Sequence, residues 1–220
     1  MSPRISTFWI LPAAAAIVGA ALGGPWLWLH YAGKPLATLS ILWLAASARP
    51  AVTARYRWMV LAGMLLSLAG DIFLMLPGDR FVPGLVAFLL AHVCYIAAFL
   101  PGSTAKARLG GLTSIAAVAL ANLVGLLPRV DAALKVPVLA YVAVLASMAG
   151  FALARAWTPA LAETLPRSVR FAAAGAMCFV VSDSLLAWDR FAGNIPMPAL
   201  LVLGTYYVAQ WCIAKSVLRR

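Results

Sequence analysis

The stretch Ser67-Leu68-Ala69-Gly70-Asp71-Ile72-Phe73-Leu74-Met75-Leu76 places one carboxylate inside an otherwise apolar run. Later in the chain, Phe179-Val180-Val181-Ser182-Asp183-Ser184-Leu185-Leu186 repeats this pattern. An ionisable side chain inside a membrane helix costs about 3 kcal/mol on insertion scales, so it generally faces a polar interior and serves a function. Asp71 and Asp183 are therefore the candidate functional site, and the rest of the chain is interpreted around them.

The composition predicts an integral membrane protein. Of 220 residues, 65% are hydrophobic and 10% are charged, whereas soluble domains are about 45–50% apolar and about 25% charged. A helix needs about 20 apolar residues to cross about 30 Å of hydrocarbon. The predicted fold class is therefore all-α, a polytopic bundle of eight transmembrane helices in a single domain, 1–220. The predicted helices are 8–23, 35–48, 57–76, 81–100, 109–127, 136–155, 168–188 and 196–216.

The net charge of +11 raises the alternative of a nucleic-acid partner. The basic residues lie at helix ends rather than in one patch, which favours orientation by the positive-inside rule and no nucleic acid. Twelve of the seventeen lysines and arginines fall on the side of the two termini, which predicts cytoplasmic termini. These are Arg4, Arg49, Arg55, Arg57, Lys106, Arg108, Arg155, Arg167, Arg170, Lys215, Arg219 and Arg220. The other five are Lys34, Arg80, Arg129, Lys135 and Arg190. Abundant Ala, Leu, Gly and Arg indicate a bacterial inner membrane.

Three other features have simple interpretations. Arg4, the apolar run at 8–22 and the small residues at 20–24 resemble a cleaved signal peptide, but the next run follows closely and we expect the segment to remain. Cys94, Cys178 and Cys212 lie singly in apolar runs and are expected to be small core residues. Trp26, Trp28, His30 and Tyr31 are expected to form an interfacial outer loop.

Both acidic runs leave the membrane in the same way. Asp71-x-x-Leu74 precedes Asp79-Arg80-Phe81, and Asp183-x-x-Leu186 precedes Asp189-Arg190-Phe191. Since the two helices are four apart and equally oriented, the pattern is compatible with a 4+4 parallel repeat. Asp79 and Asp189 are expected to be solvated turn residues.

Several polar residues accompany the acids. Ser67 lies four residues before Asp71 on the same helix face, and Gly70 removes bulk beside the acid. His92 and Tyr95 are three apart and are also expected to share a face. Lys34-Pro35 is expected to open the second helix, with Lys34 either extending to the interface or holding a phosphate, of which the first is favoured. Asn122, Tyr141, Ser147, Tyr206, Tyr207 and Gln210 are each expected to join helices.

The polar residues alone leave the chemistry open. The sequence contains no Gly-rich phosphate loop, zinc-ligand spacing or nucleophile elbow. Two buried acids in unequal surroundings can perform acid–base catalysis, one protonated and one ionised. The same set could relay protons or bind a cation in a transporter.

The arrangement of these motifs is similar to that of the lysoplasmalogenase (YhhN-like) family of membrane enzymes. The matching pieces span almost the whole chain and are specific in combination. They are Lys34-Pro35; Gly70-Asp71-x-x-Leu74; Phe81-x-x-Gly84-Leu85-x-x-Phe88-x-x-x-His92-x-x-Tyr95; Phe179-x-x-Ser182-Asp183-Ser184-x-x-Ala187; and Tyr207-x-x-Gln210.

The resemblance implies an eight-helix hydrolase that cleaves the vinyl ether bond of lysoplasmalogens. It implies Asp71 and Asp183 as the catalytic pair, a lysophospholipid substrate held in the bilayer among other membrane lipids, and neither metal nor organic cofactor. As a working hypothesis Asp183 is the acid and Asp71 the base. The expected supporting or substrate-binding residues are Lys34, Ser67, Gly70, His92, Tyr95, Ser182, Tyr207 and Gln210. The alternatives are a small transporter or proton-coupled channel, and a non-catalytic lipid-binding protein or scaffold.

Overall fold

The computed structural model describes residues 7–193 and 195–219, so Arg4 and Arg220 of the charge analysis lie outside the described residues. Nine α-helices and no strand occur within these ranges, in agreement with the all-α prediction. Two single 3-10 turns, Gly24–Trp26 and Leu127–Arg129, connect helices. The helices are α1 (Ile10–Leu22), α2 (Leu27–Ala46), α3 (Ala54–Met75), α4 (Phe81–Phe99), α5 (Ala105–Leu126), α6 (Ala132–Ala156), α7 (Pro159–Thr164), α8 (Pro166–Ala192) and α9 (Pro198–Ser216).

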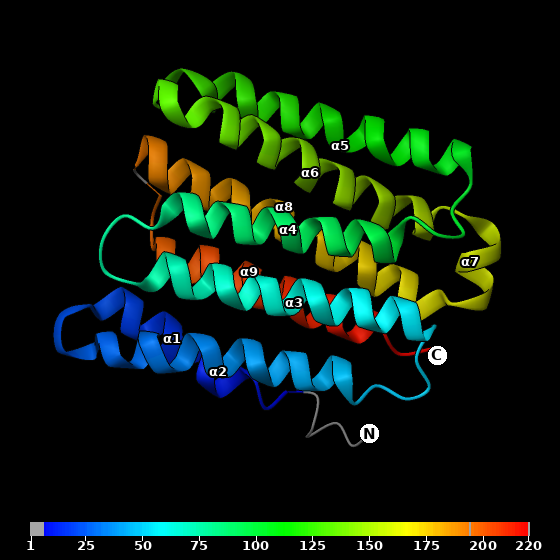
Figure 1. Ribbon diagram of the computed structural model, residues 1–220, viewed down its shortest axis with the longest axis horizontal. Coiled ribbons are helices and arrows are strands. Elements are labelled where there is room, and N and C mark those ends of the chain that lie inside the picture. The colour runs from blue at the N-terminus through cyan, green and yellow to red at the C-terminus, as the bar shows by residue number, and fades with distance from the viewer. Residues whose placement is uncertain (1–6, 194, 220) are drawn as a thin grey trace.

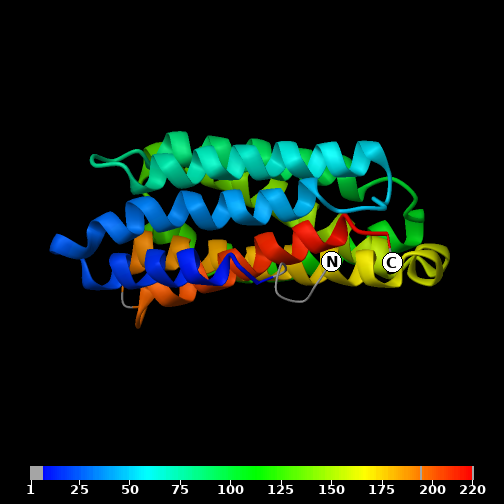
Figure 2. The same ribbon diagram turned by 90° about the horizontal axis from the view of Figure 1, so that it is seen from below.

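The long helices lie side by side in an elongated bundle (Figure 1). Sequential helices form hairpins, with α1 against α2, α3 against α4, α5 against α6 and α8 against α9. Seen after a 90° turn, α3 and α4 lie along one face of the bundle and α8 and α9 along the other (Figure 2). Helices α4 and α8 both pack against α6, so the interior of the bundle is formed where these helices meet.

Five of the described helices, α3, α4, α5, α6 and α8, are long and apolar enough to cross a membrane. The prediction of eight spans is thus supported only in part. Helix α1 has 13 residues, which at 1.5 Å per residue gives about 20 Å, less than the hydrocarbon thickness of about 30 Å. The short helix α7 was not predicted, because six residues leave no detectable periodicity in the sequence.

Helix α2 corrects two expectations from the sequence. It begins at Leu27 rather than at residue 35, so Pro35 lies inside the helix and does not open it. Residues 28–31 are consequently helical and do not form an outer loop. Proline lacks one backbone donor, but helices in apolar surroundings tolerate this because neighbouring helices and side chains satisfy the freed carbonyl group.

Local sequence signals account for helix ends and close packing. The hydroxyl groups of Thr53 and Thr104 cap α3 and α5 by accepting hydrogen bonds from the backbone N–H groups of Tyr56 and Ala107. A Cβ atom at Gly111 would lie only 2.3 Å from the carbonyl oxygen of Gly150. Helices α5 and α6 therefore approach as closely as they do because small residues face each other.

Candidate active site

Asp71 lies four residues before the end of α3 and is almost completely enclosed, with 1% of its surface exposed. The hydroxyl groups of Thr38 and Tyr206 donate hydrogen bonds to its Oδ2 atom over 2.9 and 2.6 Å. The Lys34 ammonium lies 3.2 Å from its Oδ1 atom. Helices α2, α3 and α9 thus surround this carboxylate with one cation and two hydroxyl donors.

A chain of side-chain hydrogen bonds extends from Asp71. The Gln210 amide donates to Tyr206, and the Tyr95 hydroxyl donates to the Gln210 carbonyl oxygen over 3.1 Å. Ser67 lies 3.5 Å from the Tyr95 hydroxyl. All of these side chains are buried, so they form one closed polar network, which we call the Asp71 cluster: Lys34, Thr38, Ser67, Asp71, Tyr95, Tyr206 and Gln210.

Asp183 belongs to a second group of polar side chains. The Tyr141 hydroxyl donates to its Oδ2 atom over 2.5 Å, a length typical of a hydrogen bond to a carboxylate. The His92 Nε2 atom lies 3.0 Å from the Tyr141 hydroxyl and 3.4 Å from the same carboxylate oxygen. Helices α4, α6 and α8 supply these three residues, which we call the Asp183 cluster. The Asp183 side chain is 11% exposed.

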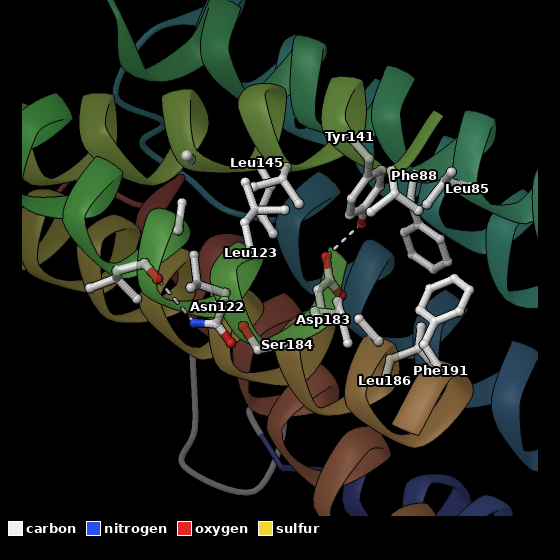
Figure 3. Close-up of a pocket in the computed structure, with 18 of the residues that line it drawn as sticks. Leu85, Phe88, Asn122, Leu123, Tyr141, Leu145, Asp183, Ser184, Leu186 and Phe191 are labelled. Carbon is white, nitrogen blue, oxygen red and sulfur yellow. Dashed lines mark hydrogen bonds between the residues drawn. The ribbon is translucent and has the colours of Figure 1, made fainter. Parts of the chain in front are cut away.

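An apolar pocket between α4, α5, α6 and α8 has Asp183 in its wall (Figure 3). Its enclosed volume is about 80 Å³, and the pocket is open along one side. Tyr141 and Asp183 meet in the middle of the labelled residues, between Asn122 on one side and Phe191 on the other (Figure 3). Asp71 does not line this pocket. The space could therefore hold an apolar chain with its reactive end against the Asp183 carboxylate.

Aromatic side chains separate the two clusters. The Phe88 ring lies 5.9 Å from the Tyr206 ring of the Asp71 cluster, and Phe88 also lines the pocket beside Asp183. The Phe179 ring lies 5.6 Å from Tyr206 and 4.7 Å from His92. A Cβ atom at Gly70 would meet the Phe88 ring at 2.6 Å, so the glycine gives this ring its place beside α3. No hydrogen bond joins Asp71 to Asp183.

The two Asp-Arg-Phe segments meet at one end of the pocket. Arg190 donates a hydrogen bond to Asp79 over 2.5 Å, and its guanidinium lies 5.2 Å from the Phe81 ring centroid. Phe81 and Phe191 pack edge to face at 5.6 Å, and both line the pocket. The hydrogen bond from Arg190 lowers the pKa of the exposed Asp79 carboxyl. Asp79 is thus a solvated turn residue, but one with a specific partner.

The structure brings most of the predicted residues together, in two groups rather than one. Lys34 is only 5% exposed and pairs with Asp71, instead of extending to the interface, because α2 begins earlier than predicted and places it inside the helix. His92 and Tyr95 share a helix face but join different clusters. Helix α8 continues to Ala192, so Asp183 lies farther from the helix end than the sequence indicated.

Two predicted residues lie outside both networks. The Ser182 hydroxyl donates to the carbonyl oxygen of Val202 and so joins α8 to α9. The Tyr207 hydroxyl has no hydrogen-bond partner among the described residues, although its ring lies 5.4 Å from that of Tyr206. It is Tyr206, the neighbouring tyrosine, that contacts Asp71.

Three contacting residues were not predicted as site residues. Tyr141 and Tyr206 were interpreted only as residues that join helices, and Thr38 was not considered. Tyr206 could have been found from its position four residues before Gln210, which places both on one helix face. Tyr141 and Thr38 gave no signal of this kind, because each is a single polar residue in an apolar helix. Within the described ranges, no three His, Cys, Asp or Glu side chains gather as metal ligands.

Comparison with known proteins identifies relatives over most of the chain. The model of the YhhN family matches residues 29–217. The human protein Lysoplasmalogenase TMEM86B is 32% identical over 164 residues, which cover 74% of this chain and 65% of that protein. Lysoplasmalogenase of Mycobacterium bovis is 33% identical over 187 residues, which cover 82% of this chain and 67% of that protein. The bovine protein Lysoplasmalogenase TMEM86A is 33% identical over 168 residues, covering 71% and 64%.

The chain therefore spans about two thirds of the length of these curated relatives. No solved structure matches it.

Proposed function

The chain belongs to the YhhN family, and from this premise we propose that it is a lysoplasmalogenase. It would hydrolyse the vinyl ether bond of a lysoplasmenyl lipid, giving a fatty aldehyde and glycerophosphoethanolamine or glycerophosphocholine. The names of its relatives favour this hydrolase over the transporter or channel alternative. The observation that carries the proposal is the apolar pocket whose wall contains the hydrogen-bonded carboxylate of Asp183.

The pocket suits the single apolar chain of a lysolipid. Its lining is almost entirely aliphatic and aromatic, with Asp183, Tyr141, Ser184 and Asn122 as the polar exceptions. Binding sites of this kind are apolar with a few placed polar groups that fix orientation. The alkenyl chain would fill the apolar part, and its vinyl ether group would lie against the carboxyl group of Asp183.

Asp183 is the residue placed to protonate the substrate. Its Oδ2 atom accepts the Tyr141 hydrogen bond, whereas its Oδ1 atom forms no hydrogen bond with another described residue. In the proposed mechanism Oδ1 carries the proton that is transferred. Protonation of the vinyl carbon distant from oxygen gives an oxocarbenium ion, and water then adds to form a hemiacetal. The hemiacetal breaks down to aldehyde and the glycerol hydroxyl group, so that one water is consumed for each lipid cleaved. A positioned general acid typically contributes about 10²- to 10⁴-fold to such a rate.

Asp71 is proposed as the base of the pair on the family resemblance, with the Lys34 ammonium, 3.2 Å from its Oδ1 atom, as the counter-charge. It would stabilise the positive charge of the intermediate and accept the proton of water. The Phe88 ring lies between Asp71 and the pocket, so Asp71 can contact water in the pocket only when this ring moves aside. His92 and Tyr95 would hold the Asp183 and Asp71 clusters in place.

We further propose one transmembrane domain of eight spans with a 4+4 repeat, in which α1 and α2 complete a bundle whose termini face the cytoplasm. The described basic residues gather at the helix ends beside α7, apart from five at or near the opposite end, in keeping with the positive-inside rule. The substrate would reach the pocket from the outer leaflet of a bacterial inner membrane. Because Lys34 is paired with Asp71, we expect the phosphate group of the substrate to contact Arg190 or Arg80 instead.

The test is aldehyde release by the detergent-purified protein from lysoplasmenylethanolamine, beside a lysolipid of equal chain length whose ether is saturated. The hydrolase should release aldehyde and glycerophosphoethanolamine in equal amounts from the first lipid and nothing from the second. Absence of release with both ethanolamine and choline head groups would contradict the proposal. Proton or solute movement across sealed vesicles, with the lipid intact, would support the transporter instead.

A further inference from the structure

The α2–α3 connection, the α4–α5 turn, α7 and the C-terminal segment lie at the opposite end of the bundle (Figure 1). Residues from these segments line a second pocket. Three arginines from separate segments line it: Arg55 at the start of α3, Arg155 at the end of α6, and Arg219 beyond α9. Thr53, Tyr56 and Pro101 complete its polar wall. We call it the arginine pocket.

Arg155 is the informative residue, because it is a buried cation without an acidic partner. Only 3% of its surface is exposed, and no carboxylate forms an ion pair with it among the described residues. Its guanidinium donates one hydrogen bond to the carbonyl oxygen of Pro101 and lies 5.1 Å from the Tyr56 ring. Its Nε atom is buried and has no acceptor.

Among the described residues, no acidic side chain compensates the charge around the pocket. Glu163 is the only acidic side chain that the structure describes at this end of the bundle; it is exposed, does not line the pocket and forms no ion pair with another described residue. The other five acids of the chain lie in or near the two clusters or the opposite connections. Burying a charge is costly unless it is paired, so a cation in this position favours an anion from outside the chain.

We propose that the arginine pocket binds a phosphate group. Arg155 lines the pocket, and its planar guanidinium has the two-point geometry by which arginine binds phosphate. Arg55 and Arg219 are exposed and lie on the same pocket, where they supply further positive charge. The phosphate belongs either to the head group of an anionic lipid or to a soluble phosphate compound. This site is separate from the Asp183 pocket and independent of the proposed hydrolysis.

The experiment measures ligand-induced thermal stabilisation of the full chain in neutral detergent. The probes are short-chain phosphatidylglycerol and inorganic phosphate, with phosphatidylcholine for comparison. The test variant carries Arg55→Gln and Arg219→Gln, both at exposed positions. The matched control carries Arg167→Gln and Arg170→Gln, which remove equal charge from exposed positions at the same end. A third variant, Arg155→Lys, retains the positive charge but loses the paired N–H donors of the guanidinium group.

Stabilisation by phosphatidylglycerol should require about tenfold or more higher ligand concentration in the Arg55/Arg219 variant, the effect of losing charge-assisted contacts. The control should match the original protein, and Arg155→Lys should be weakened. Stabilisation by the lipid alone identifies a head group as the source, and an equal response to inorganic phosphate identifies a soluble compound. No stabilisation by either probe, or an equal loss in the control, would overturn the proposal. Aldehyde release, measured on the same samples, reports separately on the proposed function.

Discussion

The Asp71 carboxylate is enclosed by three donors and does not line the apolar pocket, whereas the Asp183 carboxylate contacts two side chains and does line it. Both acids occupy similar runs of sequence, one on α3 and one on α8. Their surroundings nevertheless differ. Asp71 is paired with Lys34 inside the protein, whereas Asp183 faces a pocket in which a ligand can lie. Equal sequence context therefore does not imply equal chemical roles, and each acid needs its own test.

The largest effect is expected for Asp183→Asn. Asparagine keeps the shape and can still accept the Tyr141 hydrogen bond, but it has no acidic proton to transfer. Aldehyde release should fall by about 10³-fold or more, while the midpoint of thermal unfolding stays close to that of the original protein. Retained activity would remove Asp183 from the proposed mechanism.

Asp71→Asn should act first on stability. It leaves the Lys34 ammonium buried without its counter-charge, which costs about 3–5 kcal/mol. The double variant Lys34→Met/Asp71→Asn removes both charges and should recover most of this loss. If Asp71 is the base, the recovered protein stays inactive in the aldehyde assay; if it is only structural, activity returns with stability.

Substituting one tyrosine in each cluster allows the two clusters to be compared directly. Tyr141→Phe removes the 2.5 Å hydrogen bond to Asp183 and should slow hydrolysis by about 10- to 100-fold, as expected for a bond to a charged or reacting group. Tyr95→Phe removes a bond to Gln210 in the Asp71 cluster, and its effect should be smaller. A larger effect of Tyr95→Phe would show that the closed network, not the pocket, limits the rate.

The shape of the pocket can be tested on α5. Ala119 lines the pocket, whereas Ala117 is exposed and does not. Ala119→Leu should displace about two methylene groups of a long alkenyl chain from the pocket. At roughly 0.8 kcal/mol per methylene group, the KM for the long-chain lipid should rise by about tenfold. The KM for lipids with shorter chains should change less. Ala117→Leu is the control, and equal KM values for both variants would place the chain elsewhere.

The smallest effect is expected at the mouth of the pocket. Arg190→Gln removes an exposed ion pair with Asp79, so KM should change by no more than about fivefold. Because Arg190 lowers the pKa of Asp79, the pair is present at and above the ordinary pKa of an aspartate. It is lost only as pH falls through the lowered value. A KM difference between Arg190→Gln and the original protein should accordingly be constant near neutral pH.

Hydropathy and charge were sufficient to predict the fold class and the approximate positions of eight of the nine described helices. The start of α2 was missed because Lys34 and Pro35 are typical of a helix end. Only the tertiary partner Asp71 explains why the lysine is tolerated inside. Two of the five arginines and lysines expected on the outer side, Lys34 and Arg190, are in ion pairs.

The sequence predicted many of the residues of the candidate site, but it did not predict that they form two separate clusters. Buried acids in apolar runs stand out because their cost demands a function. Helix periodicity places His92 and Tyr95 on one face, but it cannot show that this face lies between two clusters. The partner tyrosines, Tyr141 and Tyr206, come from helices distant in sequence, so their proximity to the acids depends on packing alone.

Helix α4 supplies His92 to one cluster and Tyr95 to the other, from positions less than one turn apart. A single inserted or deleted residue upstream in this helix would turn both side chains by about 100°, removing His92 from the Asp183 cluster and Tyr95 from the Asp71 cluster at once. Length changes in α4 should accordingly be excluded in evolution, and substitutions on its two flanks should show epistasis. In contrast, α5 contributes no side chain to either cluster and is free to diversify with the chain length of the lipid.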